Sequence, residues 1–125
     1  MTLVELFYMN VEQRQKTLVA SQYAEQVLNL YQTQLEQDYL EDQFLDSLSI
    51  DSIDHRVQYA VRERTDEQAW MKALRILRAR LMFRWIWQDA NQLTNDVTLT
   101  RELSDFADAC ICAAKAFALV PLIAK

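Results

Sequence analysis

The sequence contains no glycine and a single proline, Pro121. Tight turns, hairpins and bulges depend on backbone conformations that glycine allows, so the chain lacks the usual signals of β structure. The P-loop, the dinucleotide-binding fingerprint and the nucleophile elbow also need glycine, because the backbone there turns sharply or approaches a ligand closely. The sequence therefore excludes these three kinds of site.

Residues that commonly bind metals or form disulfides are also scarce. The chain has one histidine, His55, and two cysteines, Cys110 and Cys112. Residues two positions apart in a helix point to nearly opposite sides, so these cysteines cannot bridge each other there. The sequence predicts neither a zinc site nor a disulfide framework, and we expect a cytoplasmic protein.

Carboxylates at helical spacing are the remaining candidates for chemistry. Asp38 with Asp42 and Asp105 with Asp108 are two such pairs, but pairs of this kind usually lie on a solvated helix face. We therefore predict no catalytic, cofactor-binding or metal-binding residue. We also expect no nucleic-acid or membrane partner, because the tryptophans have core spacing and charges interrupt the apolar stretch 106–124.

The residues that are abundant indicate helices. Leu, Ala, Gln, Glu and Arg dominate, and 51% of the residues are hydrophobic. A chain of 125 residues is the size of one domain. We predict an all-α fold, in which residues 1–125 form a single helical domain, a bundle of about four to six helices.

The segment from about 65 to 93 is the predicted central helix. Thr65 and Gln68 fit a capping box, and Asp66 and Glu67 suit the first turn. Its apolar residues fall on two opposite arcs, so neighbours should cover both sides. One arc holds Trp70, Met71, Leu74, Leu77, Leu81, Met82 and Trp85; the other holds Ala73, Ile76, Ala79, Phe83, Trp87 and Ala90.

Other helices are predicted on both sides of the central one. Residues 11–34 have an amphipathic pattern within which Ser21 can cap a second segment, and residues 35–48 repeat the pattern. Ser52 or Asp51 can cap a short helix over 53–63. The C-terminal helix should run from about 98 to 120 and bury Leu99, Leu103, Phe106, Ala107, Cys110, Ala113, Ala114, Phe117 and Val120.

Charge is divided along the chain. Residues 1–54 carry ten acids and two bases, a net of −8, whereas residues 55–84 carry eight bases and three acids, a net of +5. The segment 36–54 should therefore form an acidic layer on the basic central helix. Four arginines of that helix, Arg75, Arg78, Arg80 and Arg84, are candidates for ion pairs with this layer or for an interface with another domain.

The order of residues in the second half resembles a known family. In DEQAWMKALRILRARLMFRWIWQDANQLTNDVTLTRELSDFADACICAAKAFA, Asp66-Glu67 precede an alternation of Leu and Arg from Leu74 to Arg84, and Trp87 follows. Leu93-Thr94 and the small residues of the last helix complete the pattern. This region is similar to the helical segment before a nucleotidyltransferase domain in bacterial bifunctional glutamine synthetase adenylyltransferase/adenylyl-removing enzymes.

The resemblance implies a scaffold or regulatory role in a multidomain enzyme. Members of that family attach an adenylyl group to a tyrosine of glutamine synthetase with ATP and Mg²⁺, or remove it by phosphorolysis, under control of PII signalling proteins. The Arg-rich form here looks more like the first of the two repeated units, which is associated with removal.

The family's catalytic Gly-rich and Asp-x-Asp motifs are absent from this chain, so we expect it to be inactive alone and to contact a downstream nucleotidyltransferase domain. The apolar LVPLIAK end also suggests that a larger protein continues. The alternative is a free-standing helical adaptor that binds another protein.

Overall fold

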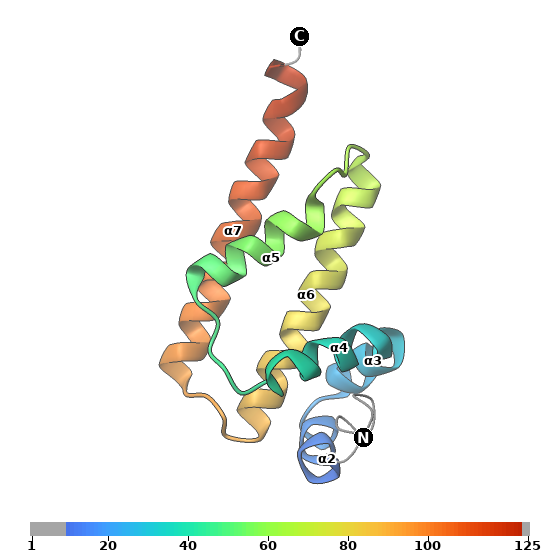
Figure 1. Ribbon diagram of the computed structural model, residues 1–125, viewed down its shortest axis with the longest axis vertical. Coiled ribbons are helices and arrows are strands. Elements are labelled where there is room, and N and C mark those ends of the chain that lie inside the picture. The colour runs from blue at the N-terminus through green and yellow to red at the C-terminus, as the bar shows by residue number, and fades with distance from the viewer. Residues whose placement is uncertain (1–9, 124–125) are drawn as a thin grey trace. The chain divides into compact units, whose positions relative to one another are not determined.

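The computed structural model describes the backbone of residues 10–123 and the side chains of residues 10–119. This part of the chain is helical and contains no strand, which confirms the predicted all-α fold (Figure 1). The helices are α2 (Val11–Ala20), α3 (Gln22–Leu30), α4 (Gln32–Asp42), α5 (Ile50–Val61), α6 (Glu67–Ala90) and α7 (Asp96–Ile123).

The chain forms two compact units. Unit 1 contains the residues up to Asp46 together with Arg78–Asn95, and unit 2 contains Ser47–Leu77 together with the residues from Asp96 onward. Helix α6 contributes its first half to unit 2 and its second half to unit 1. That residues 1–125 make a single domain stays a prediction.

Both predicted arcs of the central helix contain buried residues. Leu77, Leu81 and Trp85 of the first arc are buried, and so are Ala79, Phe83 and Trp87 of the second. Met71 of the first arc is exposed, with 53% of its surface accessible.

Polar side chains cap the starts of α3, α5 and α6, though not always the predicted ones. The Ser21 hydroxyl accepts a hydrogen bond from the Ala24 N–H, which confirms the predicted start of α3. The cap of helix α6 lies one residue later than predicted, because the carboxylate of Asp66, not the hydroxyl of Thr65, accepts from the Ala69 N–H at 2.9 Å. The helix therefore begins at Glu67. Ser49 caps α5, so that helix begins at Ile50 and not after Ser52.

Three helices, α4, α5 and α6, are followed by left-handed backbone without glycine. Gln43, Phe44, Glu63 and Gln92 all have positive φ angles. After α6, the Leu93 N–H donates to the Gln88 carbonyl at 2.7 Å and the Gln92 N–H to the Asp89 carbonyl at 3.2 Å. These are the two hydrogen bonds of a Schellman motif, with Gln92 at the position that glycine usually occupies. The motif ends the helix at Ala90, short of the predicted position 93.

Aromatic side chains form the core of unit 1. Tyr39, Phe44, Phe83 and Trp87 are each fully buried. The Phe44 ring meets the rings of Tyr39, Phe83 and Trp87 edge to face, with centroids 5.4, 6.0 and 5.5 Å apart. Each such pair adds about 0.5–1.5 kcal/mol to what burial of the rings contributes.

Helix α5 packs along α7 in unit 2. Ile53 and Val57 of α5 are fully buried, and Phe106, Ala109 and Ala113 of α7 are nearly so. The Trp70 ring lies 5.0 Å from the ring of Phe117, which joins the start of α6 to α7.

The predicted buried stripe of α7 is only partly correct. Phe106 and Ala113 are buried, but Leu103, Ala107 and Ala114 are exposed, while the unpredicted Glu102 and Ala109 are buried. Apolar and small residues surround most of this helix, so periodicity alone did not identify the face that packs on α5. The side chain of Val120 lies outside the described residues. None of the described helices is long and apolar enough to cross a membrane.

Candidate functional site: the arginines of the central helix

Arg80 pairs with Asp38 of α4. Its Nε donates to one carboxylate oxygen at 2.9 Å and its Nη2 to the other at 2.6 Å. This two-point geometry matches the planar guanidinium to the planar carboxylate. The side chains of Arg80 and Asp38 are 31% and 10% exposed, so the pair sits at the edge of the core of unit 1.

Arg84 pairs with Asp42 one turn further along both helices. Its Nη1 donates to one oxygen of Asp42 at 3.0 Å and its Nη2 to the other, and Nη2 also reaches the Asp46 carbonyl. The side chain of Arg84 is only 4% exposed and that of Asp42 15%. The guanidinium carbon lies 5.7 Å from the centre of the Phe44 ring, so the charge rests beside the aromatic core.

Gln88 provides a third contact in the same register. Its Nε2 donates to the Phe44 carbonyl at 2.9 Å and to the Asp46 carbonyl at 3.1 Å. The pairs 38 with 80, 42 with 84 and 46 with 88 are each separated by 42 residues. We call these three contacts the polar ladder. They fix how residues 38–46 and α6 are aligned within unit 1.

Asp42 also organises the turn after α4. Its carboxylate oxygens accept from the backbone N–H groups of Phe44 at 3.0 Å and Asp46 at 3.3 Å. Gln43 and Phe44 both have φ of 56°, a conformation that costs about 1–2 kcal/mol per residue for side chains other than glycine. These hydrogen bonds and the burial of Phe44 hold the turn in place against that cost.

The two ion pairs shift pKa values in the directions that stabilise charge. Burial alone would raise the pKa of Asp42, but the hydrogen bonds and positive charge of Arg84, with the N–H groups of Phe44 and Asp46, lower it below its ordinary value of 3.8. The hydrogen bonds to Asp38 raise the pKa of Arg80, against the opposing effect of burial. Asp42 and Arg80 therefore remain ionised near neutral pH.

Asn91 joins α2 to the end of α6 in unit 1. Its Nδ2 lies within hydrogen-bond distance of the Gln13 carbonyl, the Thr17 hydroxyl and the Trp87 carbonyl, at 3.2, 3.1 and 2.9 Å. Thr17 is fully buried although it is polar. No local pattern in the sequence marked the contact with α2, because Gln13 and Thr17 are more than 70 positions away from Asn91.

Unit 2 has a comparable anchor at Leu48. The fully buried Glu102 accepts the Leu48 N–H at 2.7 Å, and Arg101 donates to the Leu48 carbonyl at 3.0 Å. Arg101 also pairs with Asp105, one turn along α7, at 3.0 Å. Two adjacent residues of α7 thus hold both backbone polar groups of Leu48, in the segment before α5.

Two independent comparisons identify the family. The model of the glutamate-ammonia ligase adenylyltransferase family matches residues 11–125. The chain belongs to this adenylyltransferase family. Its sequence is also 66% identical, over 119 residues, to the bifunctional glutamine synthetase adenylyltransferase/adenylyl-removing enzyme of Acinetobacter baylyi. That alignment covers 95% of this chain and 13% of the relative. No solved structure matches the chain.

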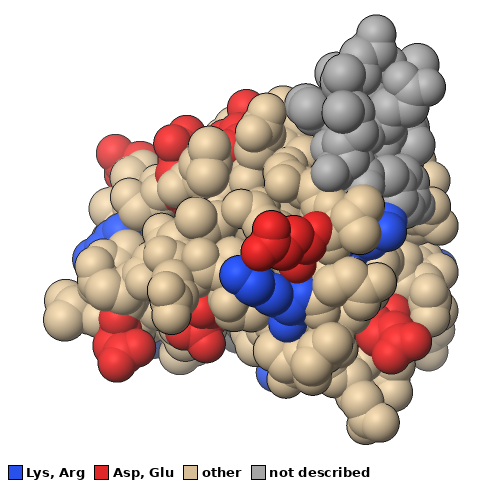
Figure 2. Space-filling model, turned by 90° about the horizontal axis from the view of Figure 1, so that it is seen from below, with Lys and Arg blue, Asp and Glu red and all other residues tan. Residues whose placement is uncertain are grey.

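In this adenylyltransferase-family chain the four candidate arginines fall into two groups. Arg80 and Arg84 are committed to the polar ladder, whereas Arg75 and Arg78 are exposed. On the face shown in Figure 2, Lys and Arg side chains lie beside Asp and Glu side chains and not in a patch of one sign.

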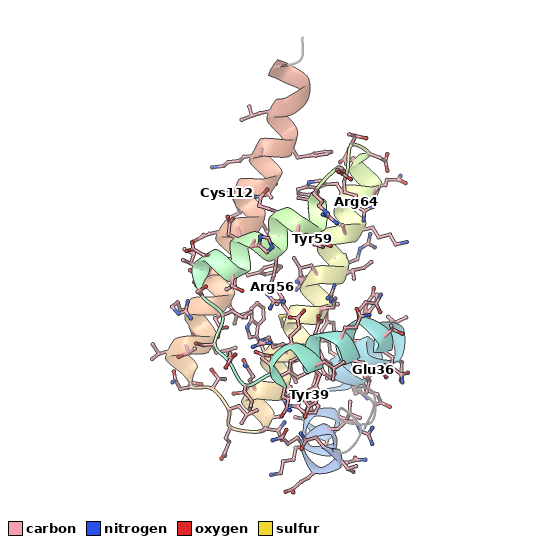
Figure 3. All side chains as sticks on the ribbon, in the orientation of Figure 1. Glu36, Tyr39, Arg56, Tyr59, Arg64 and Cys112 are labelled. Atoms are coloured by element: carbon pink, nitrogen blue, oxygen red, sulfur yellow. The ribbon has the colours of Figure 1, made fainter. Side chains whose placement is uncertain are left out.

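The basic residues in and after α5 include two that lie beside the aromatic ring of Tyr59. Arg56 and Tyr59 come from α5, and Arg64 lies in the turn before α6 (Figure 3). The Arg62 guanidinium carbon sits 3.8 Å from the centre of the Tyr59 ring, and the His55 ring lies 6.2 Å from the same ring. His55 is exposed in the middle of α5.

Proposed function

We propose that this chain is a helical scaffold segment of an enzyme that adenylylates glutamine synthetase and removes the adenylyl group. The observation that carries the proposal is the match to the family over residues 11–125, together with the activity for which the Acinetobacter baylyi relative is named. The chain spans 13% of that relative's length, so the reaction itself is assigned to other parts of the enzyme. In this proposal the enzyme is cytoplasmic.

ATP and Mg²⁺ belong to the nucleotidyltransferase domains in this proposal. The described residues do not fit a metal site, since no group of three or more His, Cys, Asp or Glu side chains among them could hold an ion. The carboxylates of the polar ladder are already occupied by arginines. Glutamine synthetase and PII proteins are partners of the whole enzyme.

The exposed side of α7 supports a contact with a downstream nucleotidyltransferase domain. Ala107, Ile111, Ala114 and Ala118 are exposed at alternating spacings of four and three, with Leu119 beside them. Ile111 and Leu119 are 54% and 50% exposed. We call these five residues the α7 apolar face. Its spacing is that of a helix seam that packs on another helix, and permanent interfaces are typically apolar.

A reaction with adenylylated glutamine synthetase and phosphate tests the scaffold role. Incubated with both, this chain should release no ADP, whereas the intact enzyme should release it. Release of ADP by the chain alone, above the level of a sample without phosphate, would contradict the proposal.

The docking role of α7 is tested in the intact enzyme that contains this segment. Ile111→Lys with Leu119→Lys should lower adenylyl removal or transfer and make the segment easier to cleave by protease. Val19→Lys is the matched control, because Val19 is 84% exposed on α2. Unchanged activity and cleavage in the α7 variant would contradict the docking role.

A further inference from the structure

We draw no further inference here: the strongest candidate, the exposed side-chain cluster of His55, Tyr59 and Arg62 along α5 and its C-terminal cap in unit 2, is built from contacts among its own three side chains, and nothing in the structure shows what would bind to it.

Discussion

Arg84 holds Asp42 with both of its terminal nitrogens, and both side chains lie largely out of solvent, with 4% and 15% of their surfaces exposed. Removing one partner of a buried ion pair leaves the other charge without compensation. Breaking the pair in this way should therefore cost more stability than the loss of a surface pair. The contact of Glu102 with Leu48 and the turn at Gln92 should also affect stability measurably.

The Asp42–Arg84 pair should be strongly coupled in unfolding experiments. Asp42→Asn and Arg84→Met should each lower the free energy of unfolding by about 3 kcal/mol, because each leaves a buried group unpaired. The double variant should cost clearly less than the sum of the two. Urea unfolding followed by tryptophan fluorescence measures the coupling. Lys16→Ala, which breaks the exposed pair with Glu12, should change stability by less than about 0.5 kcal/mol. Additive losses would contradict the coupling.

The same pair should make unit 1 sensitive to acid. The pKa of Asp42 is lower in the folded chain than its ordinary value of 3.8, so the folded state binds this proton less readily than the unfolded state does. Its contribution to stability is therefore complete above about pH 4 and is lost as the pH falls through the folded-state pKa. The stability difference between wild type and Asp42→Asn should shrink over that range in urea titrations. A difference that stays constant from neutral pH down to about pH 2.5 would show that the pKa is not lowered.

Glu102 should stabilise unit 2 because its carboxylate accepts a hydrogen bond from the Leu48 N–H. Glu102→Gln keeps a carbonyl oxygen and should cost little, whereas Glu102→Leu leaves the Leu48 N–H without an acceptor and should cost about 1–3 kcal/mol. Hydrogen exchange of the Leu48 amide provides a local measurement, with protection retained in the Gln variant and lost in the Leu variant. Ser104→Ala, on the exposed side of α7, is the control. Protection that survives in Glu102→Leu would rule out this role.

The end of α6 should gain stability from glycine. Gln92 has φ of 56° and is exposed, so Gln92→Gly relieves backbone strain without loss of packing. The relieved strain raises the free energy of unfolding, whereas the greater freedom of glycine in the unfolded chain lowers it. The net gain in the free energy of unfolding should be about 0.5 kcal/mol. Gln37→Gly, at an exposed position inside α4, should instead cost about 0.5–1 kcal/mol. A loss at both positions would mean that the Gln92 turn is not strained.

The spacing of the polar ladder residues is visible in the sequence. Asp38, Asp42 and Asp46 recur every four residues, and so do Arg80, Arg84 and Gln88. That matching period predicts that the two segments can align side by side. It leaves the choice of partners open, because shifting one segment by a turn would pair Asp42 with Arg80. The structure places Asp38 with Arg80 and Asp42 with Arg84.

Local signals alone determined the all-α class, the central helix and the Ser21 cap, because apolar periodicity and capping act within a few residues. The absence of glycine excluded the three kinds of site that need it. The division of charge predicted that the acidic segment 36–54 is attracted to the basic central helix. Only the tertiary structure decided that Arg80 and Arg84 pair with aspartates of α4 while Arg75 and Arg78 are exposed. It also decided that Glu102 is buried. These outcomes depend on contacts between residues more than 40 positions apart, which depend on how each helix is turned about its axis when it packs.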